Sequence, residues 1–432
     1  MKYYSLAKNA PEVDFKTATL LGQAPDKGLY FPKEVPQWTK SFIDSIHSLP
    51  IEELAYQVMA PYTGDTMPET VLRKIVRETL SFDIPLVKVT EDIFSLELFH
   101  GPTLAFKDVG ARFMSRCLGY FAREKKEKVV VLVATSGDTG GAVANGFYNV
   151  PGVEVVILYP SGKVSPVQEK QLTTLGKNIH ALEVMGNFDD CQRMVKTAFM
   201  DSALTNHLFL TSANSINVAR WLPQQLYYLL AWKQWPYKEH PPVISVPSGN
   251  FGNICAGLIA HHSGLPVDHF IAACNVNDVV PRYLNTGAYE PTKALATLSN
   301  AMDVGDPSNF VRILELFGQS LPELTKMLSS VSITDNETEQ TILKVYTDKG
   351  YLLDPHGAVG YLALERYLTD HPAKKGFFLE TAHPVKFPDS VERITGKKIP
   401  VPEEVKPMML AEKKSTLVGA DYIDLKEFLL NF

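Results

Sequence analysis

The sequence predicts an α/β protein with mainly parallel, twisted sheets flanked by helices, and with an additional N-terminal helical domain. From Phe94 onward, segments typical of strands alternate with loops and helical segments, which favours parallel strands joined by helices. Residues 128–134 form a continuous apolar run of the kind that is buried on both faces of a parallel sheet. Helical periodicity and proline-containing breaks dominate the residues before this alternation begins. We therefore expect an N-terminal domain at 1–92, an α/β domain at 93–400 with a smaller subdomain at about 105–235, and a C-terminal tail at 401–432.

The expected strands and helices follow one another along the chain. Strands are expected at 94–99, 128–134, 153–159, 179–184, 243–246, 270–275 and 376–380, and helices at 165–175, 189–200, 217–232 and 334–350. Two of these helices begin with capping boxes, Ser165-Pro-Val-Gln168 and Thr334-Asp-Asn-Glu337, and Pro223 is expected to disturb another. After the first strand, Gly101-Pro102 breaks the extended pattern, and Thr103 can cap a helix that carries Lys107 in its first turn.

Composition and charge exclude several classes of partner. The 432 residues are 45% hydrophobic and 21% charged, with a net charge of −6 and no basic stripe, so nucleic acid is not an expected partner. No apolar run approaches the roughly 18 residues that span a bilayer, and the N-terminus lacks the apolar core of a signal peptide. The four cysteines lie far apart in apolar contexts, which indicates buried, reduced thiols and no metal site. These facts are typical of a cytoplasmic enzyme without a membrane partner.

Lys107 is the first candidate for chemistry. The first turn of a helix is the positive end of the helix dipole, which disfavours an ammonium ion and favours the neutral amine. Free lysine has a pKa of about 10.4, and Schiff-base chemistry requires an amine that loses its proton more easily. An isolated lysine is far more often a solvated surface residue, so position alone leaves both interpretations open.

Two loops that connect a buried strand to a helix are candidate anion sites. Ser248-Gly-Asn-Phe-Gly-Asn253 contains glycines, which let the backbone turn tightly and present N–H groups next to a helix N-terminus. Thr135-Ser-Gly-Asp-Thr-Gly140 has the same setting and adds hydroxyl groups. Such loops can hold a phosphate or a carboxylate without a charged side chain, although plain structural turns have similar sequences.

The motif His100-Gly-Pro-Thr-Leu-Ala-Phe-Lys107-Asp108 closely resembles the coenzyme-lysine motif of the threonine synthases of bacteria and fungi. Gly28-Leu-Tyr-Phe-Pro32 resembles the N-terminal signature of this family, and the likeness extends to about Pro400. The resemblance implies a fold type II enzyme in which Lys107 is catalytic and forms a Schiff base with pyridoxal 5′-phosphate. It further implies that the coenzyme phosphate is held by Gly249, Asn250, Phe251, Gly252 and Asn253, that Thr381 faces the pyridine nitrogen, and that Asp138 lies near the ring.

The same resemblance implies two sites for the substrate. The substrate carboxylate is expected to contact Thr135, Ser136 and Thr139. The substrate phosphate is expected to contact Asn214, Ser215, Asn217 and Arg220, with Lys163 and Ser165 as weaker candidates. The guanidinium of an arginine can hold a phosphate with two parallel N–H bonds. His356, His383 and Lys386 can line the pocket, without an assigned role.

A substrate with one carboxylate and one phosphate fits both sites, and O-phospho-L-homoserine is such a molecule. The resemblance implies its β,γ-replacement with water to give L-threonine and inorganic phosphate, the last step of threonine biosynthesis. Two alternatives stay open. One is another fold type II lyase, such as a threonine or serine dehydratase or a β-replacing synthase. The other is a non-catalytic homologue that binds the coenzyme or a phosphorylated metabolite. The sequence does not decide between a monomer and a homodimer.

Overall fold

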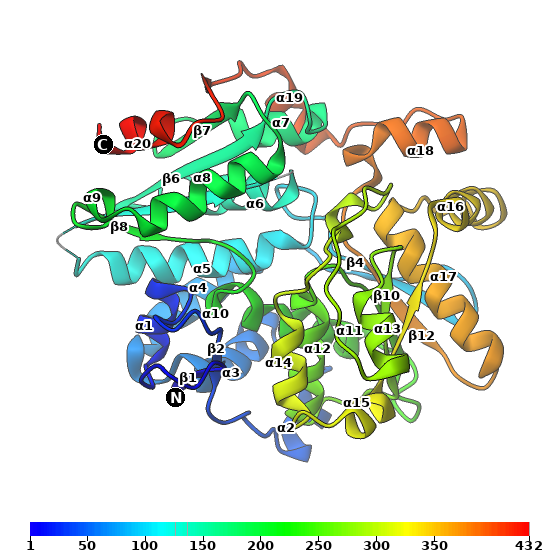
Figure 1. The fold of residues 1–432 in the computed structure, drawn as a ribbon. Coiled ribbons are helices and arrows are strands. Elements are labelled where there is room, and N and C mark those ends of the chain that lie inside the picture. Colours follow the sequence, from blue (N-terminus) through cyan, green and yellow to red (C-terminus); the bar gives the residue numbers. More distant parts are fainter. Residues whose placement is uncertain (126, 136, 432) are drawn as a thin grey trace.

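Two mainly parallel sheets form the α/β part of the chain, as Figure 1 shows for the computed structural model. The structure describes residues 1–125, 127–135 and 137–431. The six-stranded sheet has the order β11-β10-β9-β12-β4-β3, in which β3 runs antiparallel to β4 and the other neighbours are parallel. Its strands are β3 (Leu86–Lys88), β4 (Ile93–Glu97), β9 (Val243–Pro247), β10 (His269–Cys274), β11 (Leu328–Ser332) and β12 (Gly376–Glu380).

The five-stranded sheet has the order β13-β7-β6-β5-β8, with parallel neighbours throughout. Its strands are β5 (Lys128–Ala134), β6 (Val153–Pro160), β7 (Ile179–Val184), β8 (Leu208–Thr211) and β13 (Ser415–Val418). The helices of this part are α6 (Asp138–Phe147), α7 (Pro166–Thr173), α8 (Phe188–Met200) and α9 (Ser202–Thr205). These parallel sheets flanked by helices confirm the predicted fold class.

Helix α5 (Lys107–Ala122) lies below the five-stranded sheet in Figure 1 and contacts β6 of that sheet. It packs against α6 on one side and against α4 and α10 on the other. The helical stretch expected to be irregular near Pro223 is divided into α10 (Val218–Trp221), the 3₁₀ helix η2 (Leu222–Gln224) and α11 (Gln225–Gln234). The residue before α5, Phe106, donates its N–H to the carbonyl of Thr381 at the end of β12, so the first residue of α5 lies where the two sheets meet.

Helices that cover the six-stranded sheet come mostly from the later half of the chain. They are α12 (Gly252–His262), α13 (Val279–Thr286), η3 (Asn300–Met302), α14 (Phe310–Leu316), α15 (Leu321–Met327), α16 (Asp335–Lys349) and α17 (Pro355–Asp370). Helix α17 packs against β9, β10 and β12, and α16 packs on α17. Both predicted capping boxes form, at the starts of α7 and α16.

The N-terminal residues are mainly helical, as predicted, and pack on α5. Their elements are β1 (Tyr3–Ser5), α1 (Phe15–Leu21), β2 (Tyr30–Pro32), α2 (Lys40–Ser45), α3 (Ile51–Thr63), η1 (Gly64–Thr66) and α4 (Glu69–Thr79). Strands β1 and β2 pair antiparallel. The Phe15 ring lies edge-on to Phe113 and Phe121 of α5, with centroids 6.5 and 6.3 Å away, so this region shares the core of the α/β part.

The C-terminal residues return to the five-stranded sheet. Their elements are η4 (Pro384–Lys386), α18 (Pro388–Thr395), η5 (Glu403–Val405), α19 (Lys406–Leu410), β13 and α20 (Tyr422–Leu430). Strand β13 pairs with β7, and α20 packs on α8. The domain boundaries at residues 92 and 400 stay predictions.

The structure corrects the predicted start of α5. The helix begins at Lys107, and no side chain caps it. Thr103 instead donates its backbone N–H and its hydroxyl to the Asp108 carboxylate, at 2.9 and 2.5 Å. The prediction that Thr103 caps the helix was wrong, because the loop extends to Phe106 and the helix begins only after it. Strands β8, β11 and β13 were not predicted, since each is short and β11 and β13 carry little apolar sequence.

Two negative findings concern the described part of the chain. None of its helices has both the length and the apolar character needed to cross a bilayer. No group of three or more His, Cys, Asp or Glu side chains there could hold a metal ion.

Candidate active site

Lys107 is placed by pairing between the loop before α5 and the end of β12. Ala105 and Ala382 form an antiparallel bridge. Phe106 N–H donates to the Thr381 carbonyl at 2.8 Å, next to the lysine. Thr381 directly follows β12 and is buried. The structure therefore brings together Lys107 and Thr381, which lie far apart in the sequence.

Lys107 is half-buried as a residue, and its amine has no hydrogen-bond partner among the described residues. Burial lowers its pKa from 10.5 to about 8, the Asp138 carboxylate opposes this change, and the charges of Arg220 and Lys386 reinforce it. A substantial fraction of the amine is thus neutral near pH 8, as a nucleophile that attacks a carbonyl group requires. The pKa of Lys107 is lowered, as expected, and burial is the main cause.

Asp138 begins α6 and carries a buried negative charge that acts on Lys107. Its Oδ1 accepts from Lys386 Nζ at 2.7 Å and from Gln168 Nε2 at 2.9 Å. Burial alone would raise the pKa of Asp138, but the charges of Lys386 and Lys107 outweigh burial and hold it well below its usual range. Asp138 is therefore an ionised carboxylate beside Lys107, and it has no proton to donate.

The loop at 249–253 leads from β9 into α12. A Cβ on Gly249 would lie 2.6 Å from Met302 Cα, so only glycine lets this backbone approach η3. Phe251 adopts a left-handed conformation, with φ 60°, directly before the helix. Asn250 Nδ2 donates to Ser215 Oγ at 2.7 Å, and its Oδ1 accepts from Ser308 N–H at 2.7 Å. These bonds hold the loop in one conformation.

The same loop fits a phosphate group. The backbone N–H groups of residues 251–253 donate to no described residue, since they belong to the loop end and first turn of α12. Asn253 accepts the Tyr228 hydroxyl at 2.9 Å through Oδ1, while its buried Nδ2 has no partner. Several unused donors at a helix N-terminus form a site for an anion such as the phosphate of pyridoxal phosphate.

Three buried side chains support this loop from behind. Asp354 N–H donates to Glu380 Oε1 at 2.7 Å, and Asp354 Oδ1 lies 2.5 Å from His356 Nδ1. His356 Nε2 accepts from Ala301 N–H at 3.2 Å, which places the ring proton on Nδ1. Burial raises the pKa of Glu380 well above its usual value, and the Asp354 charge adds to this. This series of hydrogen bonds from Glu380 to Ala301 holds η3 in place, and Gly249 packs against η3.

The segment 214–220 lies against the same loop through Ser215. Asn214 is exposed, whereas the Asn217 side chain is used structurally: it caps α10 and donates to the Thr19 carbonyl at 2.8 Å. Arg220 is buried, and its Nη1 donates to the Ala213 carbonyl. Its Nε has no partner, and burial lowers its pKa to about 10. Arg220 is therefore a buried cation with an unused donor.

The remaining predicted residues are placed as follows. Thr135 Oγ1 accepts from the N–H groups of Gly137 and Gly140 at 3.0 and 2.9 Å, so it shapes its own loop. Thr139 is half-buried in the first turn of α6. Ser165 caps α7 and Lys163 is exposed. Ser136 lies outside the described residues.

Three contributions were not found from the sequence. Gln168, the third residue of α7, reaches Asp138, and Asn309 Nδ2 donates to the Asn250 carbonyl at 3.0 Å. Lys386 was expected only to line the pocket. The capping box of α7 accounts for a glutamine at position 168. No local sequence pattern indicates that Gln168 and Lys386 bind Asp138, or that Asn309 binds Asn250.

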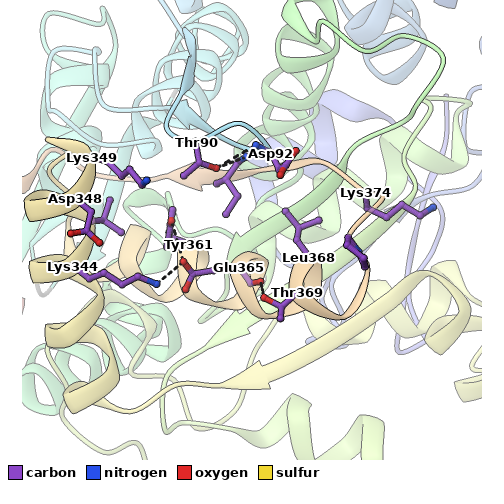
Figure 2. Close-up of a pocket in the computed structure, with 13 residues that line it drawn as sticks. Thr90, Asp92, Lys344, Asp348, Lys349, Tyr361, Glu365, Leu368, Thr369 and Lys374 are labelled. Atoms are coloured by element: carbon purple, nitrogen blue, oxygen red, sulfur yellow. Dashed lines mark hydrogen bonds and ion pairs between the residues drawn. The ribbon is translucent and has the colours of Figure 1, made fainter.

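A separate surface cavity of about 390 Å³ contains none of the candidate residues. Figure 2 shows it between α16, α17 and the segment that begins β4. Lys344 and Glu365 pair across it at 2.8 Å.

Comparisons with known proteins agree with this geometry. The family profile described as "Pyridoxal-phosphate dependent enzyme" matches residues 84–377, and those described as "Threonine synthase N terminus" and "Threonine synthase, C-terminal" match residues 2–80 and 357–429. The curated threonine synthase of Escherichia coli strain K12 is 44% identical over 432 residues, which cover 100% of both chains. That of Haemophilus influenzae is 45% identical over 431 residues, again covering 100% of both.

A solved structure shows the same relationship in three dimensions. The structure of PLP-bound threonine synthase from Brucella melitensis is 37% identical to this chain, with a TM-score of 0.95. The match covers 100% of this chain and 99% of that one. The position of Lys107 where the two sheets meet and the unused N–H donors of the loop at 249–253 agree with these matches, and the chain belongs to the threonine synthase family of pyridoxal-phosphate-dependent lyases.

Proposed function

We propose that this chain converts O-phospho-L-homoserine and water to L-threonine and inorganic phosphate by β,γ-replacement, as a cytoplasmic enzyme. The observation that carries the proposal is the position of Lys107. Its amine, with a pKa of about 8, lies where the two sheet layers meet, near a loop with unused N–H donors and near the buried cation Arg220.

The coenzyme is held by residues from both layers. The N–H groups of residues 249–253 hold its phosphate, with Asn253 Nδ2 as a further donor. Thr381 offers a neutral hydroxyl to the ring nitrogen, and Asp138 lies near the ring on the side of α6. When bound, pyridoxal phosphate supplies an electron sink that stabilises negative charge at the substrate α-carbon.

Lys107 moves the proton in this proposal. The free amine takes the proton from the substrate α-carbon as a general base, and a pKa of about 8 instead of 10.5 makes a far larger fraction of it neutral near pH 8. The absence of hydrogen bonds to described residues leaves its Nζ free to reach the substrate. Loss of a β-proton accompanies release of the γ-phosphate. Water then adds its oxygen at the β-carbon, and protons delivered to the γ- and α-carbons give the methyl group and the α-hydrogen of threonine.

Two groups of residues bind the ends of the substrate. The carboxylate lies at the N-terminus of α6, with Thr135, Ser136 and Thr139 as its contacts. The phosphate lies against Arg220, whose unused Nε is a charge-assisted donor. Asn214 and Ser215 add neutral donors, and Lys163 and Ser165 are weaker candidates. Asn217 was also predicted as a contact, but both polar atoms of its side chain bind the backbone, so it shapes this segment instead.

Phosphate release from O-phospho-L-homoserine by the coenzyme-loaded full chain tests the function. We expect phosphate and threonine in equal amounts. No release at saturating coenzyme rejects the proposal and favours a non-catalytic binding protein. Ammonia from serine or threonine without turnover of the phosphorylated substrate favours a dehydratase.

Arg220 tests the substrate assignment. We expect Arg220→Lys, which keeps the charge but loses the parallel N–H bonds, to raise KM for O-phospho-L-homoserine by roughly tenfold or more. Turnover of serine as a side substrate should change little, and Arg123→Ala, at an exposed arginine, is the matched control. Equal losses with both substrates show that Arg220 only supports the fold.

A further inference from the structure

Lys386 is a fully buried lysine that the proposed mechanism does not use. It ends η4, and its Nζ lies 2.7 Å from Asp138 Oδ1 and 2.8 Å from the Thr103 carbonyl oxygen. A buried ion pair often stabilises a fold no better than apolar side chains of the same volume, so its presence beside Lys107 indicates a role in the site.

The surroundings hold both partners of Lys386 in place. Gln168 donates to Asp138 at 2.9 Å, and Gln171 donates to the Thr103 carbonyl at 2.9 Å. An ammonium group has three N–H donors. Asp138 and Thr103 accept two of them, and no other described residue accepts the third. A buried cation with one unused donor therefore lies beside the coenzyme lysine.

The covalent structure of pyridoxal phosphate places one particular oxygen on this side. The ring carbon that bears the group attacked by Lys107 lies between the carbon with the phosphate arm and the carbon with the phenolic oxygen. The phosphate loop belongs to the six-stranded sheet, through β9 and α12. The phenolic oxygen then faces the five-stranded sheet, where α6 begins with Asp138.

We propose that Lys386 is a coenzyme-binding residue that donates a hydrogen bond to the phenolic oxygen of pyridoxal phosphate, and that Asp138 is the positioning residue that holds Lys386 there. An ionised carboxylate cannot donate to that oxygen, whereas the ammonium paired with it can. The inference rests on the proposed coenzyme site but requires no particular substrate.

The experiment compares full-length variants loaded with pyridoxal phosphate in the absence of substrate. Lys386→Met removes the donor, Lys386→Arg keeps a cationic donor, and the pair Asp138→Leu with Lys386→Met removes both charges without leaving either buried alone. The readouts are the absorption band of the bound coenzyme and the coenzyme concentration that half-saturates the apo-protein. Thermal unfolding of the apo-proteins shows that each variant is folded.

We expect both variants that lack Lys386 to lose the near-visible band of the ionised phenol in favour of a shorter-wavelength band. Their half-saturating coenzyme concentration should rise roughly tenfold or more, the effect of losing a hydrogen bond to a charged group. Lys386→Arg should keep the band.

Two results overturn the inference. If the Asp138→Leu, Lys386→Met pair has the wild-type band and affinity, Lys386 only neutralises Asp138. If the variants keep the coenzyme properties but raise KM for O-phospho-L-homoserine, the cation serves the substrate carboxylate. Absence of phosphate release by the wild-type protein would contradict the proposed function and leave the spectral comparison intact.

Discussion

Replacing Lys107 by methionine is expected to stabilise the coenzyme-free protein while abolishing covalent coenzyme attachment. The pKa of the Lys107 ammonium falls from 10.5 to about 8, chiefly because of burial. At roughly 1.4 kcal/mol for each pKa unit this difference corresponds to about 3 kcal/mol, and partial exposure of the side chain reduces the expected gain to about 1–3 kcal/mol at pH 7. Methionine has a similar length and carries no charge to desolvate.

The stability that Lys107→Met gains over the wild type should decrease as pH rises. Below pH 8 the lysine is protonated in both the folded and the unfolded chain, so the full cost of the buried charge is present in the wild type. Between pH 8 and 10.5 the folded protein has lost this proton while the unfolded chain keeps it, so the wild type gains stability relative to the variant as pH rises. The advantage of Lys107→Met should therefore shrink above pH 8.

The assay is chemical denaturation of both coenzyme-free proteins at pH 7 and pH 9.5, followed by tryptophan fluorescence. A variant that is no more stable than the wild type at pH 7, or whose advantage is equal at both pH values, would refute the reasoning. Lys344→Met, at an exposed lysine, is the matched control and should show no such gain.

Three further predictions concern the coenzyme site. The rate at which coenzyme-free wild type takes up pyridoxal phosphate, followed by absorption, should rise with pH through a midpoint near 8, and a midpoint near 10.5 would contradict the effect of burial on Lys107. Gly249→Ala should weaken coenzyme binding by about 1–3 kcal/mol, because the new Cβ would lie 2.6 Å from Met302 Cα. An unchanged coenzyme affinity would show that η3 moves away and relieves this clash. Asn253→Asp removes the unused donor and adds a charge facing the phosphate, so affinity should fall roughly tenfold or more, whereas the exposed Asn336→Asp should not change it.

The buried strands were predictable because their apolar side chains are a local property. Every residue from Val129 to Val133 in β5 is buried, as its continuous apolar run indicates. The capping boxes of α7 and α16 were predictable for a similar reason, since both partners lie within one turn. Strands β11 and β13 carry no such pattern, and each is defined by pairing with a distant neighbour.

The candidate site divides in the same way. The sequence by itself predicted Lys107 as the coenzyme lysine, through the resemblance of its motif to the family, and predicted the two glycine-containing loops as anion sites from residue type and local spacing. Only the tertiary structure decided that Gln168 reaches Asp138, that Asn217 donates to the backbone of the N-terminal region, and that Lys386 pairs with Asp138. The physical reason is that hydrogen bonds and ion pairs depend on distance in space, and packing of two sheets around α5 sets those distances for residues that no local pattern connects.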